Sequence, residues 1–220
     1  MNSKPQVTIE QLKTKAAFLG ARLTISDNST CINVVMPMTK TQEKEGQGHG
    51  DLICTPCTNT HQSNINLVMD FMNEWAEKCE LRSQIKKKEV EEFVRQKLGT
   101  DDLWAKKALL LIYSHQTASE QSVGHTVVNN SVGFSGHDSE YLTSLAKQLR
   151  KHLENVKAEC PDLTETEQLK KAWMSQKQMA ALKKAIKKYW RQVIDASDEI
   201  KLLRGVKAVR NAHQMTLNLA

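Results

Sequence analysis

The sequence predicts a mainly α-helical protein, a helical bundle with a small β-hairpin near the N-terminus (α+β). Apolar residues recur three and four positions apart along most of the 220 residues, which is the spacing of one face of an α-helix. Three segments also begin with Ser or Thr followed three residues later by Gln or Glu, the capping-box pattern of a helix start. Only residues 22–35 change to the alternating period that is typical of strands.

The N-terminal elements follow from these signals in order. Thr8 with Gln11 caps a first helix, and Gly20 is its expected stop. A hairpin follows, because apolar pairs flank a polar turn at residues 27–29. Residues 36–62 hold prolines and clustered glycines and are expected to form a long loop, which in a compact domain is usually functional or disordered.

Helical spacing resumes at Ile65. Apolar stripes predict helices over about 65–76 and 85–98, and the next helix, capped by Thr100 or Asp101, is apolar almost all round. A helix of that kind is normally buried, so Trp104 and Leu109 are expected in the core. Residues 114–136 are polar and predict a second loop.

Four more helices are expected toward the C-terminus. They start at Ser135 (to about Val156), at Thr164, at Ser175 (to about Ala196) and at Asp198. We therefore expect two parts. Residues 1–62 hold the first helix, the hairpin and the long loop, and residues 63–220 form a helical domain with a basic C-terminal third.

The composition limits the function classes. The net charge is +6, and residues 150–220 carry fifteen Lys and Arg against eight Asp and Glu. No apolar run approaches the roughly 18 residues that span a bilayer, and the first 20 residues contain no signal-peptide core. Five cysteines at irregular spacing do not suggest a disulfide framework. These features predict a soluble, cytoplasmic protein with no membrane partner.

The helix after Ser175 concentrates the positive charge. At 100° per residue its cations gather on one face opposite the apolar residues, and no carboxylate occurs between Glu167 and Asp195. Such a strip favours contact with the phosphates of a nucleic acid, and Trp190 at its edge could pack or stack on a base. A solvated amphipathic helix explains the same pattern. The candidate nucleic-acid-binding residues are Lys177, Lys183, Lys184, Lys187, Lys188, Trp190 and Arg191.

The long loop contains a Cys/His cluster. His49, Cys54, Cys57 and His61 fall within thirteen residues, and two thiolates spaced Cys-x-x-Cys can meet one tetrahedral ion. Cys31 is a further candidate ligand. The cluster makes zinc the one cofactor suggested by the sequence, although zinc sites normally pair two such motifs. A loop with incidental thiols is the alternative.

Two motifs resemble a module of phage- and plasmid-encoded proteins. The first is Asn-Asn-Ser-Val-Gly-Phe-Ser-Gly-His-Asp-Ser-Glu-Tyr-Leu-Thr-Ser-Leu-Ala at residues 129–146; the second is Met-Ser-Gln-Lys-Gln-Met at 174–179 with Lys-Lys-Tyr at 187–189. The resemblance covers about residues 105–194. It implies a mobile-element origin and a link to DNA replication or recombination, with no assigned catalytic role. The same residues could serve folding alone.

Three functions therefore stand as expectations. The first is a phage- or plasmid-encoded nucleic-acid-binding protein, most simply for single-stranded DNA, acting as a replication or recombination accessory. The second is a host-directed interaction protein that inhibits a defence or repair system. The third is a zinc-dependent enzyme or nuclease. No phosphate-binding loop, serine nucleophile elbow or zinc-protease helix occurs in the sequence, so it names no enzyme class.

Overall fold

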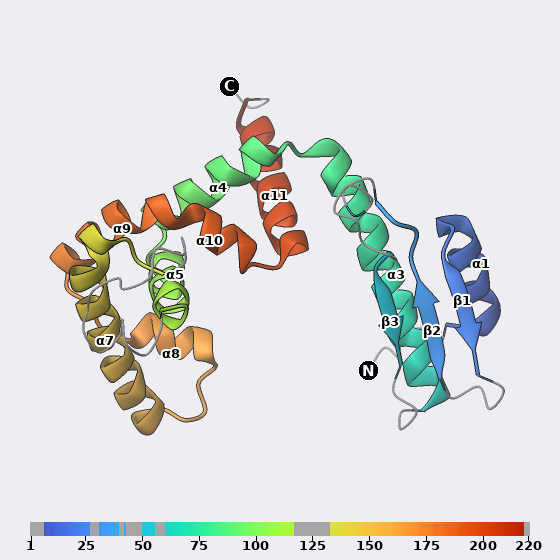
Figure 1. Cartoon of the computed structure of the whole chain (residues 1–220), viewed down its shortest axis with the longest axis horizontal. Coiled ribbons are helices and arrows are strands. Elements are labelled where there is room, and N and C mark those ends of the chain that lie inside the picture. The colour runs from blue at the N-terminus through green and yellow to red at the C-terminus, as the bar shows by residue number, and fades with distance from the viewer. Residues whose placement is uncertain are drawn as a thin grey trace. The chain divides into compact units, whose positions relative to one another are not determined.

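A computed structural model describes residues 7–26, 31–39, 42, 50–55, 60–116 and 133–217. The chain divides into two compact units, Met1–Gln84 and Ile85–Ala220. The fold is mainly α-helical with one small antiparallel sheet, as the sequence predicts (Figure 1).

The first unit has the order helix, three strands, helix. Its elements are α1 (Ile9–Leu19), β1 (Arg22–Ile25), β2 (Ile32–Val35), β3 (Leu52–Cys54) and α3 (His61–Gln84). Both hydrogen bonds of the predicted capping box form between Thr8 and Gln11, and Gly20 ends α1 with a left-handed φ of 68°. The predicted hairpin is β1 and β2.

The third strand lies in a segment that the sequence predicts as loop. β3 pairs antiparallel with β2, with Val34 opposite Ile53, so the sheet order is β1-β2-β3. A three-residue strand carries too little period-two pattern to be recognised locally, because only Leu52 and Ile53 are aliphatic. The sheet itself therefore decides the conformation of this segment.

The core of the first unit lies between the sheet and the two helices. Leu12, Val34, Val68 and Met72 are fully buried there, and α3 packs on both α1 and β2. Residues 63–84 are predicted from the sequence to belong to the helical domain. In the structure they are part of α3 and belong to the first unit, so the boundary falls after Gln84.

The second unit is entirely helical in its described residues. Its elements are α4 (Lys87–Thr100), α5 (Asp102–Ser114), α7 (Gly136–Glu159), α8 (Glu165–Lys171), α9 (Gln176–Ile186), the short 3-10 helix η1 (Lys187–Tyr189), α10 (Trp190–Asp195) and α11 (Glu199–Leu217). Capping boxes form at Thr164 and Ser175 as predicted, and the Asp101 side chain caps α5.

The almost wholly apolar α5 lies inside this unit. It contacts α4, α7, α8 and α9, and its Leu109 is fully buried as predicted. Trp104 is only partly buried; its ring meets the edge of Phe93 on α4 at 5.8 Å. The centre of the unit is filled by large side chains with little or no exposure, among them Phe134, Leu142, Leu149 and Leu182.

A buried lysine ties α5 to the end of α8. Lys106 is 6% exposed, and its ammonium donates to the carbonyl oxygens of Leu169 (3.1 Å), Lys170 (3.4 Å) and Ala172 (2.6 Å). These are carbonyls that a helix end leaves without intrahelical partners. Burial lowers the pKa of Lys106, and the nearby Asp102 charge opposes that shift.

The basic helix does not run unbroken from Ser175 to Ala196 as predicted. α9 ends at Ile186, and η1 turns more tightly before α10 begins. A 3-10 turn advances about 120° per residue in place of 100°. Angles counted along one ideal helix therefore fail beyond residue 186.

Candidate functional site

The predicted basic strip is partly closed by acids from other helices. Lys183 forms an ion pair with Asp102 and donates to the Thr100 carbonyl oxygen at 2.9 Å. Lys188 forms an ion pair with Asp138 on α7. The sequence analysis found no acidic partner within the helix, and the structure supplies partners through tertiary packing.

The remaining strip residues do not form one open surface either. The guanidinium groups of Arg95 and Arg191 lie 5.1 and 5.2 Å from the centroid of the Trp190 ring. They occupy positions over the ring where a nucleic-acid base would have to stack. The Lys187 side chain lies against Gly99 of α4. Lys177 and Lys184 are exposed. The strip therefore combines two lysines paired with acids, Lys183 and Lys188, with cations that have no such pairing among the described residues, and of its six cations only Lys183 is not exposed.

The Cys/His cluster is not assembled in the part of the chain that the structure describes. Cys54 is an exposed free thiol on β3, and Cys31 is disulfide-bonded, so Cys31 is not available as the further metal ligand that the sequence suggested. His49, Cys57 and the side chain of His61 lie outside the described residues. Among described residues there is no group of three or more His, Cys, Asp or Glu that could hold a metal ion.

The two sequence motifs meet in space. Tyr189 of the Lys-Lys-Tyr motif donates to the Asp138 carboxylate at 2.7 Å, and its hydroxyl accepts from the Ser135 backbone N–H at 3.0 Å. Phe134 is 1% exposed and meets the Tyr189 ring edge-on at 5.7 Å. The motif that resembles a mobile-element module therefore fixes the start of α7 on η1.

This contact also perturbs two pKa values. Burial raises the pKa of Tyr189 to about 12, and its hydrogen bond to Asp138 acts in the same direction. Burial alone would raise the pKa of Asp138, but hydrogen bonds from Lys188 and Tyr189 outweigh it and hold that pKa below its ordinary value. Asp138 is thus ionised at pH 7 and can form the ion pair with Lys188. Tyr189 is neutral at that pH, so its hydroxyl can donate a hydrogen bond to Asp138.

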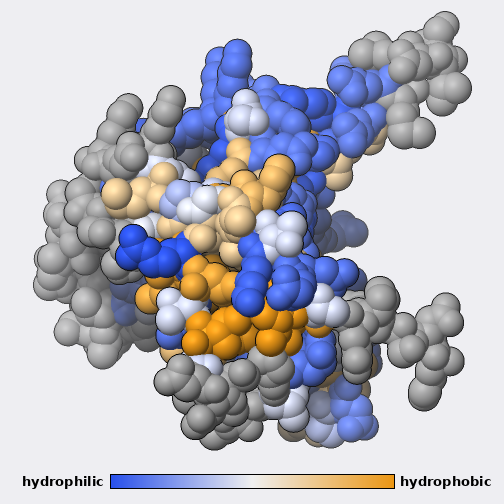
Figure 2. Space-filling view, turned by 90° about the vertical axis from the view of Figure 1, so that its right-hand side faces the viewer, coloured by the Kyte–Doolittle hydropathy of each residue, from blue (hydrophilic) through white to orange (hydrophobic). Residues whose placement is uncertain are grey.

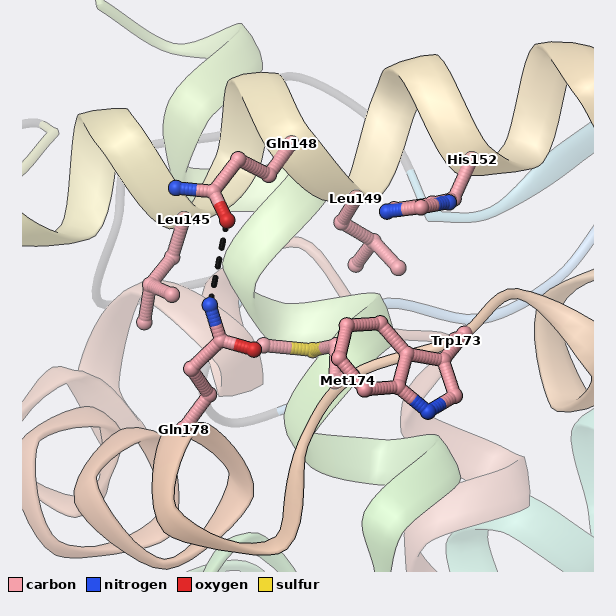
Figure 3. A pocket seen from close by; sticks show the side chains of 7 residues that line it. All are labelled: Leu145, Gln148, Leu149, His152, Trp173, Met174 and Gln178. Atoms are coloured by element: carbon pink, nitrogen blue, oxygen red, sulfur yellow. Dashed lines mark hydrogen bonds between the residues drawn. The ribbon is translucent and has the colours of Figure 1, made fainter.

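An exposed tryptophan marks a different site on the second unit. Trp173 lies in the connection between α8 and α9 and is 62% exposed. Its ring meets His152 of α7 edge-on, with centroids 5.9 Å apart and planes at 70°. Figure 3 shows the shallow pocket beside these rings, where Gln178 of α9 donates to Gln148 of α7 at 3.0 Å. The other lining residues are Leu145, Leu149 and Met174.

A second apolar surface lies on the first unit. Figure 2 looks onto the α1 and β1 side of that unit and shows apolar residues gathered between hydrophilic ones. A wide groove of about 630 Å³ runs beside α1, lined on its apolar side by Val7, Phe18 and Met69. Phe18 is 83% exposed, so the groove leaves a large ring in solvent.

Comparison with known proteins gives one finding. The family model described as Protoglobin matches residues 126–219, which is less than half of the chain. No curated protein and no solved structure was found to match. The match lies in the second unit and includes α7 to α11, so it describes similarity of the helical part only.

This similarity corrects the expected function. The matched family is globin-like and associated with haem. The match therefore contradicts the expectation of a phage or plasmid protein that binds DNA for replication or recombination. It also contradicts the expectation of a zinc-dependent enzyme or nuclease. The expectation of bound zinc is wrong on the same ground, together with the missing ligand group among described residues. The physical reason for the first error is the tertiary pairing of Lys183 and Lys188, which removes cations from the predicted strip.

The described residues do not fit a haem. Three histidines of the matched segment are described, and His137 and His213 are exposed on α7 and α11. His152 is the one beside an apolar pocket, and an imidazole is a suitable iron ligand. The cavity beside it has a volume of only about 10 Å³, near the size of one water. Ligand pockets normally measure roughly 300–1,000 Å³.

Opening that space would disturb the core. Leu149 is fully buried and Leu145 is 2% exposed, and both line the pocket from the side that faces the interior. The Gln178–Gln148 hydrogen bond links α9 to α7 across it. A haem bound at His152 would have to separate these two helices, so within the residues that the structure describes this pocket is not a built haem site.

Sequence reasoning did not single out Trp173. One signal was present, since Trp173 stands between two predicted helices, just before the Ser175 cap, where no apolar stripe assigns it to a core. Its partner His152 gave no signal, because the two residues meet only when α8 folds back along α7. No helix among the described residues is long and apolar enough to span a membrane.

Proposed function

We propose that this chain is a binding protein whose globin-like helical unit carries a surface recognition site in place of a haem pocket. The observation that carries this proposal is Trp173, which is 62% exposed on a well-packed helical scaffold. Tryptophan is the residue most often found as a binding hot spot, because a large rigid ring gives much contact area at little entropic cost.

The surroundings of Trp173 support recognition more than folding. His152 meets the edge of the indole and limits its freedom, while most of the ring stays in solvent. Met174 adds an adaptable apolar side chain to the same pocket. A residue needed only for the core would be buried, as Leu182 and Ile186 of α9 are.

The alternative that the family similarity raises is haem binding, and a titration tests it. Hemin is added to the purified chain while the Soret absorbance and the thermal midpoint are followed. We expect no saturable one-to-one signal and no rise in the midpoint, because a bound ligand stabilises the folded state. Stoichiometric binding that is lost in His152→Ala but kept in His137→Ala would overturn the proposal.

The resemblance of residues 105–194 to a phage and plasmid module stays a prediction, since the comparisons contain no match that bears on its motifs. The structure gives those motifs a folding role through Tyr189 and Asp138.

A further inference from the structure

The chain segments next to Trp173 and His152 are rich in basic residues. Residues 168–178, which contain Trp173, include three lysines and no Asp or Glu. Residues 144–153 of α7, which form the opposite wall with His152, include Lys147, Arg150 and Lys151 and no acid. We call Trp173, Met174 and His152 with the exposed Lys151, Lys171 and Lys177 the Trp173 surface.

These cations differ from those of the basic helix. Lys183 and Lys188 are held by Asp102 and Asp138, whereas no ion pair within the described residues includes Lys151, Lys171 or Lys177. The Lys171 ammonium lies 3.5 Å from the Cys160 Sγ. The positive potential at this surface is therefore available to an external acid.

We propose that the Trp173 surface binds an acidic amphipathic segment of a partner protein, one that presents an apolar side chain flanked by carboxylates. The inference rests on the proposed function and names the partner's chemistry. An apolar side chain would pack on Trp173 and Met174, since both are wholly or partly exposed. The carboxylates would face Lys151, Lys171 and Lys177, which gives complementary charge on the rim of an apolar centre.

The probe is a phage-displayed library of random dodecamer peptides, selected on the full chain and counter-selected on Trp173→Ala. We expect the enriched peptides to carry net negative charge together with at least one aromatic or large aliphatic residue. The best sequence is then synthesised with a fluorescent label, and its affinity is measured by anisotropy. Far-UV circular dichroism confirms that the exposed Trp173→Ala substitution leaves the helices folded.

Charge reversal separates specific from general attraction. Lys171→Glu with Lys177→Glu should weaken the peptide at least about tenfold, while Lys184→Glu with Lys207→Glu, an equal charge change at exposed positions elsewhere, should change the affinity less than about twofold. Raising the salt from about 50 to about 300 mM should also weaken binding, because the charges on the rim are solvated.

Several results would overturn the inference. These are enrichment that does not depend on Trp173, enriched peptides that are neutral or basic, equal losses in the two double variants, or a labelled oligonucleotide that displaces the peptide from the wild-type surface. The hemin titration reports on the proposed function separately. A chain whose stoichiometric hemin binding is lost in His152→Ala but kept in His137→Ala fails the first proposal whatever the peptides do, and a chain that binds neither hemin nor peptide fails only this one.

Discussion

The Tyr189 hydroxyl donates a 2.7 Å hydrogen bond to the carboxylate of Asp138, 51 residues earlier in the chain. Through this contact η1 holds the first turn of α7, and Lys188 adds an ion pair to the same carboxylate. Five predictions follow from this and three other contacts of the second unit.

Removal of the Tyr189 hydroxyl should destabilise the protein. Tyr189→Phe keeps the ring and its packing on Phe134 but leaves Asp138 and the Ser135 N–H without this partner. We expect a loss of about 1–2 kcal/mol, the usual result of leaving partly buried polar groups unpaired. Urea unfolding measures it. Tyr141→Phe, at a tyrosine that is 45% exposed, is the matched control and should change the midpoint little.

The same contact predicts a dependence of stability on acid pH. The pKa of Asp138 is lower in the folded protein, so the unfolded chain binds its proton more readily. The stabilisation is complete above the ordinary pKa of 3.8 and is lost as the pH falls through the lowered value. Thermal midpoints measured from about pH 6 to about pH 2 should fall less steeply in Asp138→Asn than in the wild type. Identical slopes would mean that the carboxylate gains nothing from Lys188 and Tyr189.

The buried ammonium of Lys106 should be needed for stability. Lys106→Met keeps the aliphatic stem but leaves the carbonyls of Leu169, Lys170 and Ala172 without this donor. We expect a loss of about 2–3 kcal/mol, because a charged donor to several carbonyls is removed at a buried position. Lys107→Met is the control. Lys107 is exposed, and its ammonium donates to the hydroxyl of Thr166 on α8. Equal effects of the two substitutions would contradict a special role for Lys106.

The close approach of α11 to α4 should not tolerate a larger residue at Gly205. A Cβ atom there would lie 2.6 Å from Cζ and 3.0 Å from Cε1 of Phe93, whose ring is held by its contact with Trp104. Gly205→Ala should cost about 1–3 kcal/mol through overpacking. Gly136→Ala, at a helical glycine with nothing within 4 Å of the added atom, should be neutral or slightly stabilising. A neutral Gly205→Ala would show that Phe93 can move aside.

The adjacent lysines Lys183 and Lys184 of α9 should contribute differently to the stability of the protein. Lys183→Met removes an ion pair to Asp102 and a hydrogen bond to the Thr100 carbonyl, whereas Lys184 is exposed. We expect Lys183→Met to lower stability by about 1 kcal/mol and Lys184→Met to change it within about 0.5 kcal/mol. Thermal unfolding at low and high salt checks both values. A larger loss of stability from Lys184→Met than from Lys183→Met would contradict the contacts of Lys183 with Asp102 and Thr100.

Local patterns in the sequence are enough to predict the elements that short-range interactions stabilise. Apolar spacing and the caps at Thr8, Thr164 and Ser175 predicted most helices, because a helix start is stabilised by groups only three residues apart. The hairpin and the buried α5 were predicted for the same reason, since their patterns lie within a few residues.

The contacts of the charged and aromatic side chains, in contrast, depend on how distant helices and strands pack. Asp102 and Asp138 reach Lys183 and Lys188 from 50 or more residues away, and β3 exists only because β2 pairs with it. Trp173 and Trp190 look equally available in the sequence, yet Arg95 and Arg191 flank one ring while the other stays 62% exposed. Exposure and charge pairing depend on which helices pack together, and no local spacing records that.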